Sequence, residues 1–295
     1  MQIIDGNKLA ADIKAELRQK VDAITAQGKR PPHLAAVLIG DHPASRSYVT
    51  NKVKSCSEAG FNSTLIQRPA EISQKLLMDI IRDLNDDPEI DGFIVQLPLP
   101  EQIDEVDVTL AIKPEKDVDG FHPMNIGRMT LGLPAYLPAT PMGIMQMLER
   151  YHIDVAGKQC CVIGRSNIVG TPISILLSRR AVPGDGTVVL CHSRTPNIKE
   201  IAFASDILVV ALGRPQFVKA DMVREGAVVI DVGINRIDDP SKKSGFRLVG
   251  DVDYDQVAPK CSYITPVPGG VGPMTVTSLL LNTWKAYMGE IYPKS

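Results

Sequence analysis

The chain has 295 residues, of which 44% are hydrophobic and 22% charged, and its formal net charge is -2. This length suits two globular domains, and the small net charge gives no reason to expect nucleic acid or an anionic membrane as a partner. Five cysteines without a CxxC pair predict neither a disulfide framework nor a zinc site, and together with the lack of an apolar signal core or bilayer-length run they favour a cytoplasmic protein.

Strands and helices alternate in the first part of the chain. Apolar residues at helical spacing and glycine stops predict helices over 9–24, 47–60 and 76–84. Short apolar or β-prone runs predict strands over 33–40, 62–68 and 91–100. This order indicates a mostly parallel sheet covered by helices.

A second alternating segment follows a loop-rich region at about 98–139. Thr140 is the predicted N-cap of a new helix, with Pro141 at its first position. Apolar strands are then predicted over 158–164, 187–193, 206–213, 226–234 and 262–265, before a last helix over 275–287.

The predicted fold class is α/β, with two α/β domains and a cleft between them. The first domain comprises residues 1–139 and is completed by a C-terminal helix in 274–295. The second comprises residues 140–273 and is a Rossmann-type, doubly wound sheet.

The turn after the first strand of the second domain reads G-R-S-N-I-V-G-T-P, residues 164–172. A Rossmann fold binds pyrophosphate at this position, where free amide groups and the positive end of the helix dipole favour an anion. The usual G-x-G-x-x-G is incomplete, because Ser166 stands in place of the second glycine. The alternation that follows strengthens the prediction of a dinucleotide site.

The end of the second strand, C-H-S-R-T, indicates which dinucleotide is bound. NAD sites usually carry an acidic residue here for the ribose 2′-hydroxyl, and none is present. Ser193 donates hydrogen bonds, and Arg194 and Arg165 carry positive charge suited to a 2′-phosphate. The pattern favours NADP, the alternative being that both arginines are ordinary surface charges.

Two polar positions in the first domain are candidates for chemistry. Tyr48 and Lys52 lie four residues apart and share one face of the predicted helix, where a buried lysine would act as an acid or base. Gln96 ends an apolar strand, at the sheet edge where ligands bind in open α/β sheets. The plain alternative is that all three side chains face solvent.

Two acidic residues and a stiff loop complete the candidates. Asp117 and Asp119 flank Val118, and a carboxylate here either bonds its own turn or grips an aminopyrimidine edge. No histidine or third acid at a familiar spacing supports a metal. The loop T-P-V-P-G-G-V-G-P-M-T, 265–275, is either a tight strand-to-helix turn or a wall against a ligand.

Together these motifs resemble the bifunctional methylenetetrahydrofolate dehydrogenase/cyclohydrolase family. The resemblance covers nearly the whole chain and is carried, in the family's order, by Y-V-T-N-K (48–52), V-Q-L-P-L-P (95–100), K-D-V-D-G-F (116–121), G-R-S-N-I-V-G-T-P (164–172), C-H-S-R-T (191–195) and P-V-P-G-G-V-G-P-M-T (266–275).

The resemblance implies two reactions and their sites. NADP⁺ takes a hydride from 5,10-methylenetetrahydrofolate, and water opens the resulting methenyl cation to 10-formyltetrahydrofolate. Lys52 is then the central cyclohydrolase residue, held by Gln96, with Tyr48 orienting the folate and Asp119 binding the pterin. Further folate contacts are implied for Val95, Leu97, Pro268, Gly269, Gly270, Val271 and Gly272, and NADP contacts for Gly164, Arg165, Ser166, Ser193, Arg194 and Ile234. A homodimer is also implied.

Three rival functions remain at this stage. A dehydrogenase without cyclohydrolase activity leaves Lys52 and Gln96 without a role. A non-catalytic NADP- or folate-binding protein leaves two intact sites without a reaction. An unrelated Rossmann oxidoreductase leaves the loop at 266–275 and the Y-V-T-N-K motif unexplained.

Overall fold

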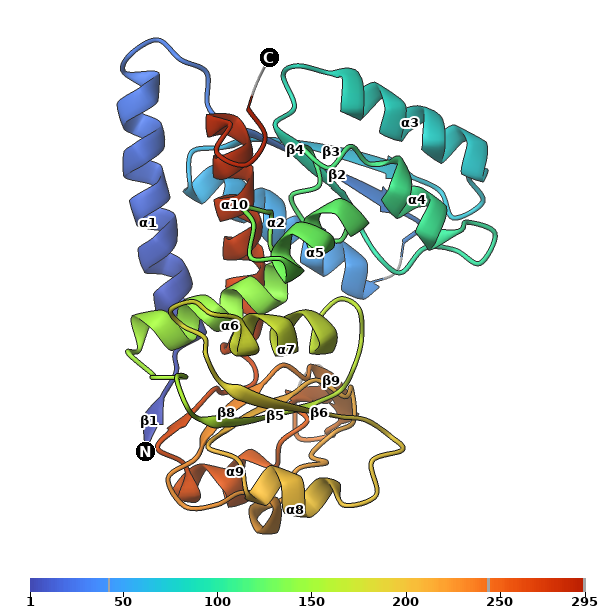
Figure 1. Cartoon of the computed structure of the whole chain (residues 1–295). Coiled ribbons are helices and arrows are strands. Elements are labelled where there is room, and N and C mark those ends of the chain that lie inside the picture. The colour runs from blue at the N-terminus through green and yellow to red at the C-terminus, as the bar shows by residue number, and fades with distance from the viewer. Residues whose placement is uncertain (42, 243–244, 294–295) are drawn as a thin grey trace. The chain divides into compact units, whose positions relative to one another are not determined.

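The computed structural model describes residues 1–41, 43–242 and 245–293, without the side chains of 43–45, 47 and 48 (Figure 1). The chain forms two compact units. The three-stranded unit contains residues 11–139 and 276–295, and the six-stranded unit contains 1–10 and 140–275. Residues 1–10, expected in the first domain, belong to the six-stranded unit because β1 (Gln2–Ile3) pairs in parallel with β11 (Tyr263–Ile264).

The three-stranded unit is built on the predicted parallel sheet, in the order β3-β2-β4. Its strands are β2 (His33–Ile39), β3 (Asn62–Arg68) and β4 (Gly92–Val95). The crossovers are α2 (Pro43–Glu58) and α3 (Gln74–Asp86). The central strand β2 is almost wholly apolar because helices cover both sides of the sheet.

Each face of this sheet is covered by a different set of helices (Figure 1). On one face α3 and α4 (Glu105–Ala111) pack on Val37, Phe93 and Val95. The other face lies toward α1 (Gly6–Thr25), α2 and α10 (Val271–Met288).

The expected loop-rich region between 98 and 139 contains two short helices that we missed, α4 and α5 (Pro123–Thr130). Their first turns are capped by the side chains of Asp104 and His122. Such short helices depend on caps and tertiary packing, so they leave little apolar periodicity in the sequence.

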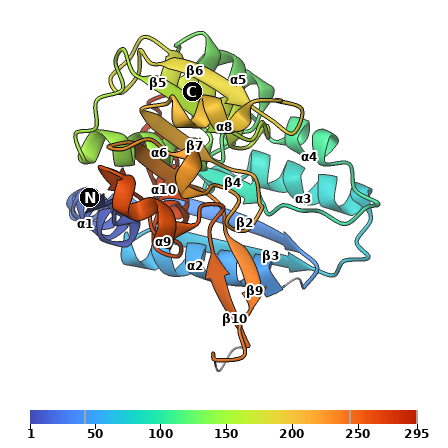
Figure 2. The same ribbon diagram turned by 90° about the horizontal axis from the view of Figure 1, so that it is seen from below.

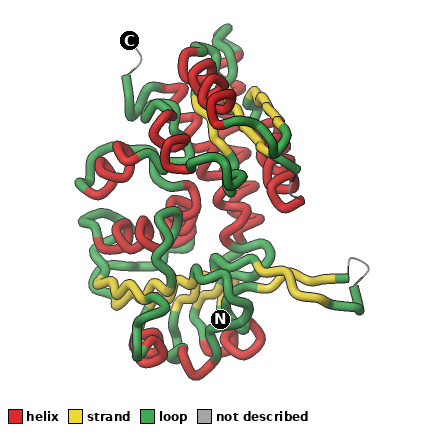
Figure 3. The backbone as a smooth tube through the Cα atoms, turned by 90° about the vertical axis from the view of Figure 1, so that its right-hand side faces the viewer, coloured by secondary structure: helices red, strands yellow, loops and turns green. Residues whose placement is uncertain are grey.

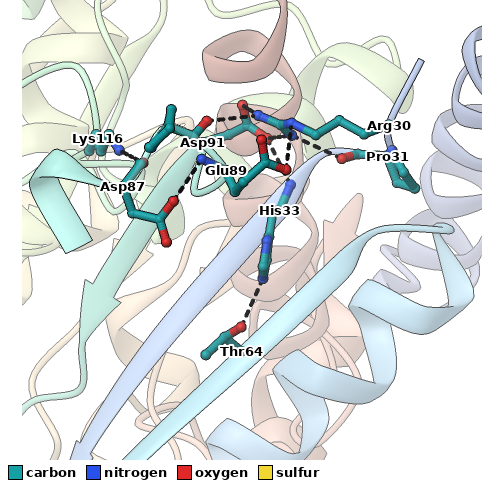
Figure 4. A network of polar contacts seen from close by, with 9 residues as sticks. Arg30, Pro31, His33, Thr64, Asp87, Glu89, Asp91 and Lys116 are labelled. Atoms are coloured by element: carbon teal, nitrogen blue, oxygen red, sulfur yellow. Dashed lines mark hydrogen bonds and ion pairs between the residues drawn. The ribbon is translucent and has the colours of Figure 1, made fainter. Parts of the chain in front are cut away.

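A polar network joins the start of β2 to the turn before β4 (Figure 4). Arg30 donates from Nη1 and Nη2 to the two carboxylate oxygens of Asp91, at 2.7 and 3.0 Å. The backbone amide of His33 also donates to Asp91, at 2.8 Å, and the His33 ring contacts Thr64 Oγ1 on β3. The Asp91 side chain is 1% exposed, so it relies on these donors instead of water.

We expect Asp91→Ala to lower the free energy of unfolding by about 3 kcal/mol, because it strands a half-buried guanidinium and an amide without their acceptor. Urea unfolding followed by circular dichroism measures this loss. The matched control is Asp86→Ala, which breaks only an exposed ion pair with Lys113. Equal midpoints for the two variants would contradict a structural role for the Asp91 network.

The six-stranded unit has the predicted doubly wound character. Its strands follow the order β1-β11-β8-β7-β5-β6, and every neighbouring pair is parallel. The bounds of the predicted strands are β5 (Gln159–Ile163), β6 (Thr187–Cys191), β7 (Ile207–Val210) and β8 (Val228–Asp231). From β5 the chain goes out to β6 and then returns to β7 on the other side of β5. The topological switch point therefore lies between β5 and β7.

Helices cover both faces of this sheet. The short helices α8 (Ile198–Phe203) and α9 (Tyr254–Val257) bury Ala202 and Val257 in one core with Ile163 and Val210 (Figure 1). The opposite face carries α7 (Gly170–Ser178). The remaining helical elements are α6 (Ala139–Arg150) and the short 3₁₀ turns Ala220–Met222 and Ala258–Lys260.

Some elements of this unit differ from the prediction. Strands β9 (Asn235–Asp238) and β10 (Phe246–Val249) form a separate antiparallel ribbon that we had not predicted (Figures 2 and 3). Helix α6 begins at Ala139, so Thr140 lies in its first turn and contacts Thr275 Oγ1 at 2.9 Å. Helix α10 begins at Val271, inside the glycine-rich loop.

Candidate functional site

Lys52 is an unusual cation because it is only 7% exposed. It projects from α2, whose apolar stripe includes the buried Val49 and Cys56. Burial lowers the pKa of Lys52, and the negative charge of Asp119 opposes that shift. The alternative of a solvent-facing lysine is therefore wrong, and this ammonium group loses its proton more easily than a solvated one.

Gln96 is the hydrogen-bond partner of Lys52. It follows β4 at the carboxyl end of the parallel sheet, and its Oε1 accepts from Lys52 Nζ at 3.0 Å. Its Nε2 donates to the carbonyl of Leu97 at 2.7 Å, which orients the amide with its oxygen toward the lysine. This contact joins two motifs that lie 44 residues apart in the sequence.

Asp117 organises the loop that carries Asp119. Its carboxylate accepts from the backbone amides of residues 120–122 and from Asn125 Nδ2 at 2.9 Å. Burial raises the pKa of Asp117 to about 7, and these donors work against that rise. Of the two acids in K-D-V-D-G-F, Asp117 is thus the one that bonds its own turn.

Asp119 is the acid of that motif that interacts electrostatically with Lys52. Burial raises the pKa of Asp119, and the positive charge of Lys52 lowers it. The preceding carbonyl, that of Val118, accepts from Asn282 Nδ2 at 2.9 Å, so α10 holds the loop from behind. A cavity beside Asp119 is also lined by Val95 and Leu97. The structure thus brings together five of the predicted residues: Lys52, Val95, Gln96, Leu97 and Asp119. The side chain of Tyr48 lies outside the described part.

The turn after β5 in the six-stranded unit explains its two glycines. Gly164 has φ +120°, and a Cβ there would lie 2.1 Å from the carbonyl oxygen of Ala211, at the end of β7. A Cβ on Gly170, the first residue of α7, would lie 1.9 Å from the carbonyl oxygen of Gly164. Any larger residue would push the helix off the turn, so this geometry matches the close strand-to-helix packing of a dinucleotide fingerprint.

Ser166 corrects one detail of the sequence interpretation. We expected free amides at the start of α7, but those of Val169 and Gly170 donate to Ser166 Oγ at 3.2 and 3.3 Å. The serine hydroxyl acts as a cap, because these amides would otherwise lack an acceptor.

The three predicted 2′-phosphate residues lie on two neighbouring loops. Arg165 follows β5, and Ser193 and Arg194 follow β6, whose last residue pairs in register with Ile163 of β5. All three side chains are exposed. Parallel strands end at one sheet edge, so both loops lie at the same edge.

The glycine-rich loop packs on the start of its own chain. The amide of Asn7 donates to the Gly269 carbonyl at 3.1 Å, and a Cβ on Gly6 would lie 1.8 Å from the Gly270 oxygen. Gly269 has φ +100°, and a Cβ on Gly270 would lie 2.5 Å from the carbonyl oxygen of Pro266, so the tight-turn alternative accounts for two of the three loop glycines. A Cβ on Gly272 would meet Ile234 Cδ1 at 3.5 Å, so two further predicted site residues are neighbours. Pro268 and Val271 belong to the same loop, with Val271 buried.

Two buried carboxylates at this sheet edge escaped the sequence interpretation. Asp231 ends β8 and is 3% exposed, whereas Asp251 follows β10 and is fully buried. Their signal in the sequence is an acidic residue at the end of an apolar run, directly in A-V-V-I-D (227–231) and after one glycine in L-V-G-D (248–251).

Within the described residues no group of three or more His, Cys, Asp or Glu side chains is arranged to hold a metal ion. Among the helices built from those residues, none has both the length and the apolar composition needed to cross a bilayer.

Two family models match the chain. The model described as tetrahydrofolate dehydrogenase/cyclohydrolase, catalytic domain, matches residues 4–119, and that of the NAD(P)-binding domain matches residues 138–290. The Bifunctional protein FolD of Cytophaga hutchinsonii is 60% identical over 286 residues, covering 97% of this chain and 99% of that protein.

Solved structures agree with this assignment. The bifunctional enzyme FolD, methylenetetrahydrofolate dehydrogenase/cyclohydrolase, of Campylobacter jejuni matches with a TM-score of 0.92 and 43% identity, over 98% of this chain and 99% of that one. The Trypanosoma brucei enzyme, complexed with NADP cofactor and inhibitor, matches with a TM-score of 0.92 and 38% identity over 98% of both chains. The protein belongs to the tetrahydrofolate dehydrogenase/cyclohydrolase family.

Proposed function

We infer that the chain oxidises 5,10-methylenetetrahydrofolate with NADP⁺ and hydrolyses the methenyl product to 10-formyltetrahydrofolate. The observation that carries this inference is the hydrogen bond between buried Lys52 and Gln96, beside Asp119, in a chain whose other unit has a dinucleotide fold. A dehydrogenase alone, or a binding protein, would not need a buried lysine with a lowered pKa.

Hydrolysis needs a water, a proton acceptor and a proton donor. Water adds to the methenyl carbon, the bond from that carbon to N5 breaks, and one proton is released overall. We propose that Lys52 accepts the proton of the attacking water and returns one to N5. Burial lowers the pKa of Lys52, which brings its neutral and charged forms closer to balance near neutral pH.

The neighbours of Lys52 have supporting roles in this proposal. Gln96 Oε1 holds the amine in one place, and its own amide is fixed by the Leu97 carbonyl. Asp119 is proposed to bind the pterin, since its loop is anchored by Asp117 and Asn282. Tyr48, Val95, Leu97 and the loop Pro268–Gly272 are proposed to contact the folate.

The six-stranded unit fits an NADP site. The close packing at Gly164 and Gly170 holds the fingerprint turn against the end of β7, at the switch point where such folds bind dinucleotides. The chemistry that NADP⁺ supplies when bound is acceptance of a hydride from the folate methylene. Gly164, Ser166 and Ile234 are proposed to hold the nucleotide, and Arg165, Ser193 and Arg194 to face its 2′-phosphate.

A two-wavelength assay with methylenetetrahydrofolate and NADP⁺ tests this function, with a no-enzyme control for spontaneous hydrolysis. We expect NADPH to rise while methenyltetrahydrofolate stays low. Methenyl accumulating in step with NADPH would instead leave only the dehydrogenase. Tight binding of NADP⁺ without turnover would favour a non-catalytic protein.

Replacing Arg165 by alanine is expected to weaken NADP⁺ binding about tenfold and NAD⁺ binding much less, because only NADP⁺ carries a 2′-phosphate. Fluorescence titration with both nucleotides measures the two dissociation constants. The control is Arg224→Ala, since Arg224 pairs with Asp206 before the start of β7. If Arg165→Ala weakened the binding of NADP⁺ and NAD⁺ equally, Arg165 would not recognise the 2′-phosphate.

We also propose a homodimer in the cytoplasm, on the family resemblance and the cysteine usage. Light scattering during size exclusion tests the dimer, with twice the chain's mass as the expected value.

A further inference from the structure

Asp251 is a fully buried carboxylate with four N–H donors around it. Its Oδ2 accepts from the backbone amides of Leu212 and Gly213 at 2.6 and 2.9 Å. Its Oδ1 accepts from the amide of Arg214 and from Asn235 Nδ2, both at 2.8 Å. An ionised carboxylate has acceptor sites for all four donors, whereas an asparagine amide would turn its own N–H groups toward two of them.

Asp231 holds Asp251 in turn. Its oxygens accept from the backbone amides of Asp251 and Val252 at 3.0 and 2.9 Å. Its own amide donates to Thr265 Oγ1 at 2.7 Å, which ties the network to the start of the glycine-rich loop. Side chains are excluded where the backbone approaches, because a Cβ on Gly233 would lie 2.4 Å from Asp251 Cγ.

The backbone that Asp251 holds lies at the switch point of the sheet. Residues 212–214 follow β7, and the preceding carbonyl, that of Ala211, is the one against which Gly164 packs. Asn235 is adjacent to Ile234, a proposed cofactor contact. One carboxylate thus restrains the loop after β7 and the first residue of β9, which follows the loop after β8. Both β7 and β8 lie on the same side of β5 in the sheet.

The two sides of a switch point receive different halves of a dinucleotide. The 2′-phosphate end lies at the loop after the second strand, here β6, so the nicotinamide half extends across the crevice toward β7 and β8. We propose that Asp251 is a positioning residue for the nicotinamide half of the cofactor, acting through the backbone of 212–214 and through Asn235. This inference rests on the proposed NADP-dependent function.

A purely structural role makes a different prediction. If Asp251 only stabilised the six-stranded unit, its loss would weaken the binding of both halves of the cofactor to the same extent. If it positions the loops after β7 and β8, the adenine half is unaffected, because the loops after β5 and β6 have no contact with this carboxylate among the described hydrogen bonds.

The test compares NADP⁺ with 2′,5′-ADP, which has the 2′-phosphate and adenine but no nicotinamide. For Asp251→Asn we expect the dissociation constant of NADP⁺ to rise about tenfold or more, because two of the four donors lose their acceptor. The constant for 2′,5′-ADP and the rate of methenyltetrahydrofolate hydrolysis, which uses no nucleotide, should stay within about twofold of the unaltered protein.

Two further variants sharpen the result. Asn235→Ala removes one of the four donors and leaves the carboxylate, so it should weaken NADP⁺ about threefold and leave 2′,5′-ADP unchanged, even if Asp251→Asn does not fold. Asp206→Asn is the matched control, because Asp206 accepts from the amide of Gln159 at the opposite end of β5. This variant should leave the dissociation constants of both nucleotides unchanged.

If the Asn235→Ala and Asp251→Asn variants lost affinity for NADP⁺ and for 2′,5′-ADP equally, the positioning role would be overturned. It would also be overturned if neither variant changed NADP⁺ binding. Failure of the unaltered protein to bind NADP⁺ at all would overturn the proposed function together with this inference, and the first titration separates that case from the others.

Discussion

Replacing Lys52 by methionine is expected to slow the hydrolysis of added methenyltetrahydrofolate about a thousandfold, the size typical of a lost acid–base catalyst. Methionine keeps the length and burial of the side chain but removes the amine that Gln96 holds. The variant should fold, since a lysine that is 7% exposed is itself costly to bury. The decay of methenyl absorbance, corrected for spontaneous hydrolysis, measures the effect.

Lys54→Met is the matched control for this experiment. Lys54 lies on the same helix two residues later, but its side chain is 74% exposed, so hydrolysis should be unchanged. In the coupled assay Lys52→Met should still form NADPH and should accumulate methenyltetrahydrofolate. Hydrolysis by Lys52→Met at the rate of Lys54→Met would remove Lys52 from the mechanism.

The second large effect is expected for Gly170→Ala, which should weaken NADP⁺ binding about a hundredfold. The new Cβ would lie 1.9 Å from the carbonyl oxygen of Gly164, so α7 must move away from the fingerprint turn. Isothermal titration calorimetry with NADP⁺ measures the loss. Hydrolysis of added methenyltetrahydrofolate should survive, because its proposed proton-transfer residue, Lys52, lies in the three-stranded unit.

Gly127→Ala is the control, since Gly127 is also helical and has open space where a Cβ would be built. Alanine favours a helix in both places, so any difference between the variants comes from the clash and not from helix propensity. If Gly170→Ala leaves the affinity for NADP⁺ intact, the close packing of Gly170 on Gly164 does not contribute to nucleotide binding.

Local patterns determined much of this protein. The alternation of apolar runs and helical periodicity predicted both parallel sheets, because strands covered on both faces must be continuously apolar. The helical spacing of Tyr48 and Lys52 marked Lys52 as a candidate, and the polar ends of two strands marked Gln96 and Arg194. The predictions of strands and helices succeed because they depend on residues that are near neighbours in the chain.

The missed elements have a common physical origin. Strand β1 has two residues and exists only because β11 offers a parallel edge, and α4 depends on an Asp104 cap and on the core below it. The β9–β10 ribbon lacked the clear alternation that predicts a hairpin. In each case tertiary contacts, and not local propensity, stabilise the element.

Only the tertiary structure decided which polar groups work together. Lys52 meets Gln96 across 44 residues, Asp251 grips the amide of Leu212 across 39, and Asn282 reaches the Val118 carbonyl across 164. The sequence by itself determined the elements and the chemistry available, since periodicity and turn residues are local properties. The partners of a buried charge depend on which strand ends the folded sheet brings to one edge, and no local pattern encodes that.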